Sequence, residues 1–475
     1  MATFTYKPAA TSDFWGLLYG IEQSIALSSV TPTKAVLDAG DFVIEYTGTG
    51  LAAGAAPAGT ITGAKFYLVD LSVAGGRVEV FSGTGINVSF ATFLDAFAED
   101  PVGSIDLIFA AADNQTGSAA SDQMFGGGGA DTMNGGDGDD ILFGGFGDFE
   151  TGDGNDSLVG GNGNDVLWGE DGADTLVGGA GNDQLYGDLS FPAIAGQPAS
   201  AGADSMLGGA GNDTYWVDRA ADRVVEVAGE GSNDRVIMFG GSGFTSYTLA
   251  ANVENLSVYT PFPSITNPTP PVITGNGNAL NNKISVLNVA FGGQTQGAVR
   301  LDGKAGNDRI AAGAGNDTVI GGAGNDSLIG GVGADDFVFN SRVGTDLVYD
   351  FRSGSDDIAV SQALLRVGDG DTVVEGGVVR AASGGFSATA ELVIVQSNIA
   401  GAITTASAAA KIGDATAAYA VGRTAIFAVD NGSATGVFLF TAADANADVS
   451  AAELTLLGTL TSTPSTALGD YLFVS

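Results

Sequence analysis

Residues 160–186 read GGNGNDVLW, GEDGADTLV and GGAGNDQLY, three consecutive copies of one nine-residue unit. The unit follows the pattern G-G-x-G-x-D-x-U-x, in which U is an apolar residue. Further copies occupy residues 126–143, 151–159, 208–216 and 303–338. A short unit repeated in tandem indicates a solenoid, in which each copy supplies one structural element and neighbouring copies stack.

Each position of the unit has a physical role. Glycine at positions one, two and four permits positive φ and close approach of the backbone at a turn. The x-U-x segment predicts a three-residue strand whose central side chain faces a narrow core. Two units make one coil, so side chains 18 residues apart are expected to stack.

The aspartate at position six places carboxylates one above another. We expect stacking of Asp122 on Asp140, Asp156 on Asp174, Asp165 on Asp183, Asp308 on Asp326, and Asp317 on Asp335. Carboxylates one strand spacing apart repel each other by about 1 kcal/mol per pair even in water. Carboxylate and carbonyl oxygens are the ligands that calcium prefers, so several calcium ions are expected between coils. The predicted metal ligands are Asp122, Asp131, Asp140, Asp156, Asp165, Asp174, Asp183, Asp213, Asp308, Asp317, Asp326 and Asp335.

The composition agrees with chemistry carried by oxygen atoms. The 475 residues include 75 glycines but no cysteine and no histidine, and 17 Lys and Arg face 55 Asp and Glu, for a net charge of −38. The missing residue types exclude disulfides, Ser-His-Asp and Cys-His triads, and zinc sites built on histidine or cysteine. The negative charge disfavours nucleic acid as a partner.

These repeats resemble the RTX family, the repeats-in-toxin or hemolysin-type calcium-binding proteins. Residues 211–258 and 333–358 resemble segments that flank RTX arrays in secreted proteins. The resemblance implies an all-β fold with a parallel β-roll in two arrays. It also implies a type I secretion machinery as partner and an uncleaved C-terminal secretion signal, for which Asp470–Ser475 is the candidate, with a plain edge strand as the alternative. The N-terminus lacks the basic and apolar regions of an ordinary signal peptide, so we expect an extracellular or cell-surface protein exported by the other route.

The expected organisation has five parts. They are an N-terminal β-rich domain with one short helix (1–116), a first roll (117–216) with an inserted loop (187–198), an irregular β segment (217–302), a second roll with its closing segment (303–360), and a C-terminal β-rich domain with the secretion signal (361–475).

Some units depart from the pattern. Residues 144–150 are two residues short and have Phe149 in place of aspartate, which puts a calcium site next to Asp131 in doubt. Asp204 stands at position six of a degenerate unit that follows the inserted loop. In another degenerate unit Asn282 takes this position, and its neutral amide would bind calcium more weakly.

Outside the repeats, alternating apolar patterns predict strands at 42–46, 65–71, 77–81, 86–90, 424–430 and 436–442, with DNGS (430–433) as a hairpin turn. Residues 91–100 and 450–457 are expected to be helical. Asp444, Asn446 and Asp448 resemble the start of an EF-hand loop, but Val449 and Thr455 stand where that loop needs Gly and Glu. This segment is either a metal site or the N-cap of the second helix.

Three functions remain open. The first is a non-catalytic secreted calcium-binding protein with a structural or adhesive role in a surface layer or biofilm matrix, through self-assembly or binding of cell-surface polysaccharide. The alternative is an exported carbohydrate-active enzyme or a glycan-binding module with an RTX carrier, although Glu22, Glu45, Glu79 and Glu99 have no spacing that pairs any two. A pore-forming toxin is disfavoured because no long apolar helix precedes the repeats, so no membrane insertion is expected.

Overall fold

The computed structural model describes strands within residues 2–89, and residues 112–145, 154–188, 202–241, 243–260, 270–287, 297–396, 398–461 and 465–475. The chain divides into two compact units, Met1–Asp234 and Arg235–Ser475. Within the described residues, regular helix is confined to α4 (Thr405–Ile412) and one 3-10 turn at Leu468–Asp470. The predicted all-β class is therefore confirmed.

The first unit begins with a mainly antiparallel sheet. Its strands are β1 (Ala2–Tyr6), β2 (Ala26–Thr31), β3 (Lys34–Asp38), β4 (Phe42–Ala52), β5 (Ala58–Asp70) and β6 (Gly76–Ser89). The predicted strands are in place but run longer, and those at 77–81 and 86–90 form the single strand β6. The helix expected at 91–100 lies outside the described residues. Because β1 also pairs in parallel with β7 (Asp113–Thr116), this sheet continues directly into the roll.

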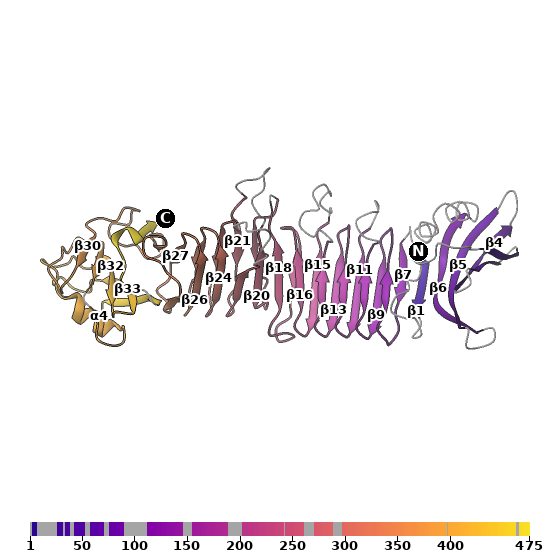
Figure 1. The fold of residues 1–475 in the computed structure, drawn as a ribbon, viewed down its shortest axis with the longest axis horizontal. Coiled ribbons are helices and arrows are strands. Elements are labelled where there is room, and N and C mark those ends of the chain that lie inside the picture. The colour runs from indigo at the N-terminus through magenta and orange to yellow at the C-terminus, as the bar shows by residue number, and fades with distance from the viewer. Residues whose placement is uncertain are drawn as a thin grey trace. The chain divides into compact units, whose positions relative to one another are not determined.

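The first roll consists of short parallel strands in two sheets. They are β7, β8 (Gln123–Phe125), β9 (Thr132–Asp137), β10 (Ile141–Phe143), β11 (Ser157–Asn162), β12 (Val166–Trp168), β13 (Thr175–Ala180), β14 (Gln184–Tyr186), β15 (Ser205–Ala210), β16 (Thr214–Val217) and β17 (Arg223–Val225). The odd-numbered strands from β7 to β17 pair in one sheet, and the even-numbered strands from β8 to β16 pair in the other. Each coil therefore contains two strands, as predicted. Figure 1 shows β9, β11, β13 and β15 side by side.

The core of this roll is one side chain wide on each sheet. The position-eight residues Leu142, Leu167 and Leu185 are completely buried and stack in register along β10, β12 and β14. The facing sheet presents Leu158 and Leu176 in the same way. Each strand buries only its central side chain and leaves the two flanking side chains at least partly accessible. Burial therefore depends on stacking between coils, and a single coil has no core of its own.

Position nine carries a column of aromatic rings on the outer side of one sheet. The rings of Phe125, Phe143, Trp168, Tyr186 and Trp216 stack with interplanar angles of 8–16°. The ring centroids of Trp168 and Tyr186 are only 3.6 Å apart, and those of Tyr186 and Trp216 are 3.8 Å apart. These contacts tie neighbouring coils together from outside the core.

The second unit contains a second parallel roll. Its strands are β18 (Arg235–Phe239), β19 (Ser246–Thr248), β20 (Asn255–Tyr259), β21 (Ile273–Asn276), β22 (Lys283–Val286), β23 (Val299–Asp302), β24 (Arg309–Ala314), β25 (Thr318–Ile320), β26 (Ser327–Val332), β27 (Asp336–Phe339), β28 (Asp346–Val348) and β29 (Asp357–Ser361). Even-numbered strands pair in one sheet and odd-numbered strands in the other.

The segment 217–302 is more regular than expected. It contains the parallel strands β18 to β22, and β22 and β23 pair in register with β24 and β25 of the repeats that follow. Apolar residues such as Leu256 and Ile284 keep the inward position and are completely buried. Stacking therefore persists where the glycine turn is lost, because the strand pairing requires only the inward apolar residue.

The C-terminal part adds β30 (Val378–Arg380), β31 (Leu392–Val395), β32 (Thr424–Asp430), β33 (Ala434–Thr441) and β34 (Leu454–Thr461) to the sheet. The predicted β32–β33 hairpin is confirmed. The expected helix at 450–457 is wrong, because β34 begins at Leu454 and pairs with both β33 and β28. Helix α4, which the sequence analysis missed, begins at a capping box formed by Thr404 and Ser407.

The chain ends in a strand of the roll. β35 (Tyr471–Val474) pairs in parallel with β29, so the last residues form the edge of the seven-stranded sheet. The carboxylate of Asp470 accepts hydrogen bonds from the Gly354 amide at 2.9 Å and from the Ser353 hydroxyl at 2.5 Å. The edge strand expected from the sequence is therefore present in the folded protein, and the secretion signal at Asp470–Ser475 stays a prediction.

Candidate metal centre

The position-six aspartates stand in columns at the corners of the rolls. In the first unit Asp140 donates its backbone N–H to Oδ1 of Asp165 at 2.8 Å, and Asp165 does the same to Asp183 at 2.8 Å. Asp122 and Asp213 extend this column at its two ends through the same contact. One carboxylate oxygen of each aspartate therefore fixes the coil beside it.

A second column lies on the opposite corner of the same roll. Asp131, Asp156, Asp174 and Asp204 follow one another with N–H to Oδ1 distances of 2.7–2.9 Å. Asp131 stacks on Asp156, 25 residues away, so the irregular segment at 144–150 does not interrupt the column. The inserted loop lengthens the Asp174–Asp204 interval to 30 residues, and again the register is kept.

The second unit repeats the arrangement. Asp308 stacks on Asp326, and Asp317 stacks on Asp335, at 2.7 and 3.0 Å. Asn282 occupies the column position before Asp308 and is 2% exposed, as its place in a degenerate unit predicted. All five expected stacking pairs are thus present across the two units.

The second carboxylate oxygen of these aspartates is buried and accepts no hydrogen bond from any described residue. This is true of Oδ2 in Asp140, Asp156, Asp165, Asp174, Asp183, Asp213, Asp308, Asp317, Asp326 and Asp335. Each of these residues is at most 2% exposed. A buried carboxylate oxygen without a partner is costly, and such oxygens in regular columns suit a bound cation.

Glycine lies beside most of these oxygens, and the unit of Asp317 has Ala312 at the same position. A β-carbon at Gly160 would overlap Oδ2 of Asp165, and it would lie 2.7 Å from the carbonyl oxygen of Gly178 in the next coil. At the turn, Gly161 has φ of 117°, and a β-carbon there would overlap the carbonyl oxygen of Gly136. The glycines therefore bring backbone carbonyls and carboxylates close together, in a space that a side chain would fill.

Burial and mutual repulsion weaken the acidity of these carboxylates. Burial, with a smaller contribution from the charges of Asp165 and Asp122, raises the pKa of Asp140 to about 7. Burial also raises the pKa of Asp174, to about 9, with Asp156 and Asp204 among the charges that add to it. In the second unit burial and the charge of Asp326 raise the pKa of Asp308 to about 7. A cation beside such groups would reverse this effect by favouring the ionised form.

The donor set fits a hard divalent cation. It contains only carboxylate and carbonyl oxygens. When ionised, the stacked aspartates carry more negative charge than the basic side chains of the described residues neutralise. Calcium takes six to eight oxygen ligands in flexible geometry and therefore suits a site made from turns and side chains of adjacent coils. When bound, it would supply charge neutralisation and crosslinks between coils.

The twelve predicted ligands all lie in these columns and are at most 7% exposed. The sequence analysis missed further members that accept the same contact, namely Asp222, Asp234, Asp346 and Asp356. Their coils lack part of the glycine pattern, but each keeps an aspartate two residues before an inward apolar residue. That shorter D-x-U signal would have found them.

Two other acidic groups have structural partners. In the candidate EF-hand loop, the side chain of Asn446 accepts a hydrogen bond from the backbone amide of Asp448. The carboxylate of Glu453, which follows this loop, accepts hydrogen bonds from the backbone amides of Ala443 and Ser450. No helix follows at 450–457, so the N-cap interpretation fails together with that helix.

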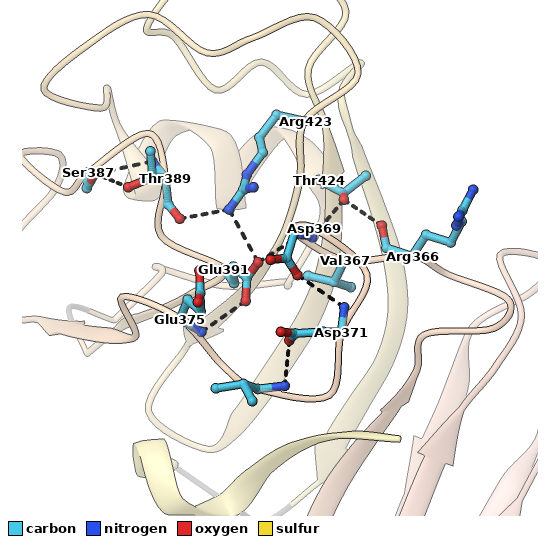
Figure 2. Close-up of polar contacts among 12 residues, drawn as sticks. Arg366, Val367, Asp369, Asp371, Glu375, Ser387, Thr389, Glu391, Arg423 and Thr424 are labelled. Atoms are coloured by element: carbon cyan, nitrogen blue, oxygen red, sulfur yellow. Dashed lines mark hydrogen bonds and ion pairs between the residues drawn. The ribbon is translucent and has the colours of Figure 1, made fainter. Parts of the chain in front are cut away.

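The second group surrounds Glu391 in the C-terminal part (Figure 2). The buried carboxylate of Glu391 accepts the amides of Asp369 at 3.1 Å and Glu375 at 2.9 Å, and it contacts the guanidinium of Arg423 at 3.4 Å. Both oxygens thus have partners, and the carboxylate holds the 369–375 loop against β32. This is a structural network.

Comparison with known families agrees with this geometry. The family model of the RTX calcium-binding nonapeptide repeat matches in four copies, at residues 116–148, 150–185, 199–224 and 302–337. A search of curated proteins finds no match. The four matched segments contain the aspartate columns described above, and this repeat binds calcium. The chain therefore carries RTX calcium-binding nonapeptide repeats in these four segments.

Proposed function

We propose that this is a secreted, non-catalytic protein that folds on calcium after export and serves a structural or adhesive role outside the cell. The observation that carries the proposal is the set of buried Oδ2 atoms that accept no hydrogen bond from the described residues. The twelve predicted aspartates hold the ions in this proposal. Because the ionised carboxylates within a column repel each other when no cation is bound, calcium binding is coupled to the stacking of the coils.

The proposed folding switch follows from calcium concentration. Calcium sites of extracellular modules bind at ~10⁻⁴–10⁻³ M, far above the free calcium available inside cells. The chain would then remain unfolded and threadable before export by a type I system and fold outside. No helix among the described residues is long and apolar enough to cross a membrane.

Edge strands support the proposed structural role. Among the described strands, β35 is the edge of the seven-stranded sheet of the second unit. Such an edge is a template for lateral pairing with another chain. The aromatic column of the first roll is the feature nearest to a glycan platform. However, its rings lie face to face on one another, at centroid distances of 3.6–6.2 Å, so their broad faces are already used.

Calcium titration of the full chain tests this proposal. Circular dichroism would follow strand formation, light scattering would follow assembly, and binding to intact cells would follow adhesion. We expect strand signal to appear with calcium, followed by ordered association or cell binding. Folding to a stable monomer that turns over a polysaccharide would overturn the non-catalytic role. Unchanged strand content after calcium removal would overturn the folding switch itself.

A further inference from the structure

The last coil of the first unit breaks the glycine rule. Strands β13, β15 and β17 pair in register, so Glu226, directly after β17, stands where the two preceding coils have Gly178 and Gly208. At Gly208 a β-carbon would overlap both Oδ2 of Asp213 and the hydroxyl of Tyr215. A glutamate at the same corner one coil later therefore brings a further carboxylate into the aspartate column.

Three carboxylates meet at this corner. Asp213 donates its backbone N–H to Oδ1 of Asp234 at 2.9 Å, as in every other step of the column. One carboxylate oxygen from each of Asp213, Glu226 and Asp234 lies within 4.8 Å of the others. The three residues are 1%, 7% and 1% exposed. Over the part of the chain that the structure describes, this is the one place where three acidic ligands come so close.

A buried hydroxyl positions the added carboxylate. Tyr215 stands at the inward position that leucine occupies in β12 and β14, and it is completely buried. Its hydroxyl donates to Oε1 of Glu226. Replacement of leucine by tyrosine and of glycine by glutamate thus occur in adjacent coils and meet in one contact.

One oxygen in the cluster points to a ligand independently of the acidic residues around it. Oδ2 of Asp213 is buried, accepts no hydrogen bond from the described residues, and lies beside the Tyr215 hydroxyl. Burial and the neighbouring charges of Asp234 and Asp213 raise the pKa of Glu226 to about 7, against the hydrogen bond from Tyr215. The corner therefore concentrates three acidic side chains in a buried place.

We propose that Asp213, Glu226 and Asp234 form a calcium site at the end of the first roll, which shares Asp213 with the repeat column but differs from the repeat sites in its ligands. It uses three side-chain carboxylates, with Tyr215 holding Glu226 in place, whereas the repeat sites combine aspartates with glycine carbonyls. Because calcium affinity rises with the number of charged ligands, this site is expected to fill before the repeat sites. The inference rests on the proposed calcium-dependent folding and adds to it a first-filled site that closes the roll.

Terbium luminescence and calcium stoichiometry test the site. Terbium bound here would be sensitised by Tyr215 and Trp216, so the full chain should show a tight emission phase at low terbium. The Glu226→Gln variant should lose that phase or shift it at least ~10-fold, and should bind one calcium fewer in equilibrium dialysis. Glu226→Gly restores the pattern of the other coils and should fold with calcium while losing the same ion. Glu230→Gln, at an exposed position nearby, is the matched control.

The outcomes separate this inference from the proposed function. If the wild type, Glu226→Gln and Glu226→Gly bind equal numbers of calcium ions with the same tight phase, the end site is refuted while the repeat sites stand. If Glu226→Gln stabilises the calcium-free protein and loses no ion, Glu226 is a protonated partner of Tyr215 and the proposal falls. If the wild type binds no calcium at all, the proposed function fails as well.

Discussion

Acid should replace calcium in part as the agent that stabilises the rolls. Burial raises the pKa values of Asp140, Asp156 and Asp183 from the ordinary 3.8 to about 7 in the folded, metal-free protein. A folded pKa above the unfolded value means that the folded state binds protons more tightly. The resulting stability is fully present below pH 3.8 and is lost as the pH rises through 7.

The size of the effect follows from these values. Between pH 8 and pH 5.5, one carboxylate with a folded pKa of about 7 adds about 2 kcal/mol to the free energy of unfolding. The three residues would together add up to about 6 kcal/mol, less whatever is lost because neighbouring carboxylates titrate as a coupled stack. A pH of 5.5 keeps the chain above its isoelectric point of about 4.1, where it would precipitate.

The assay compares calcium-free and calcium-loaded protein at the two pH values. Urea unfolding would be followed by circular dichroism and by fluorescence of Trp168 and Trp216, which report on the stacked coils. We expect the calcium-free protein to gain stability, or strand content, at pH 5.5. The calcium-loaded protein should lose stability there, because protons compete with the ion for the carboxylates.

Variants separate the columns from general charge effects. Asp140→Asn should reduce the pH dependence of the calcium-free protein by up to about 2 kcal/mol, whereas Asp171→Asn, at an exposed turn position, should leave it unchanged. Two results would refute the reasoning. One is equal stability at pH 8 and pH 5.5 in the absence of calcium, and the other is the same change of stability with pH in the presence and absence of the ion.

Three further changes test other parts of the molecule. Replacing both Asp165 and Asp183 with Asn should raise the calcium concentration at the midpoint of folding about tenfold or more, because the site loses charged ligands. Replacing exposed Asp171 with Asn should leave this midpoint unchanged. An unchanged midpoint in the double variant would disprove the pairing of Asp165 with Asp183. Gly161→Ala should destabilise the first roll by about 1–3 kcal/mol in calorimetry, because φ at this residue is 117° and the added methyl group would overlap the carbonyl oxygen of Gly136. Unaltered stability would contradict the close approach of the coils. Glu391→Gln should lower the free energy of unfolding in urea by about 1–3 kcal/mol, and it should increase hydrogen exchange in the 369–375 loop, from whose amides the carboxylate accepts hydrogen bonds. Unaltered exchange would mean that the carboxylate does not hold this loop.

The repeats could be predicted from sequence because each unit carries its own instructions. Gly161, Asp165 and Leu167 each have a role that depends only on the identical residue in adjacent coils, so a local pattern determined turn, column and core together. The same logic failed where the pattern was incomplete. Asp234 and Asp346 keep their place through strand pairing, and neither has the full glycine turn that marks a unit in the sequence.

Outside the repeats, tertiary pairing outweighed local preference. Residues 450–457 contain helix-favouring alanine, glutamate and leucine, yet β34 forms because its partners β28 and β33 supply two sets of backbone hydrogen bonds. Glu226 shows the limit most clearly. Its importance arises from Tyr215 and Asp234, and nothing in its own neighbourhood in the sequence marks it as part of the column.

The intervals between stacked aspartates have a consequence for how such a chain can change. In one column the steps from Asp131 to Asp156 and from Asp174 to Asp204 span 25 and 30 residues, while the step from Asp156 to Asp174 spans 18. The hydrogen bonds of these three steps nevertheless have the same length within 0.2 Å. The coil therefore fixes which residues stack and leaves the length of the connection free. Foreign peptides inserted between Asp188 and Gly202 should leave the ladder intact, which makes this corner a natural position for displaying a sequence on a calcium-assembled scaffold.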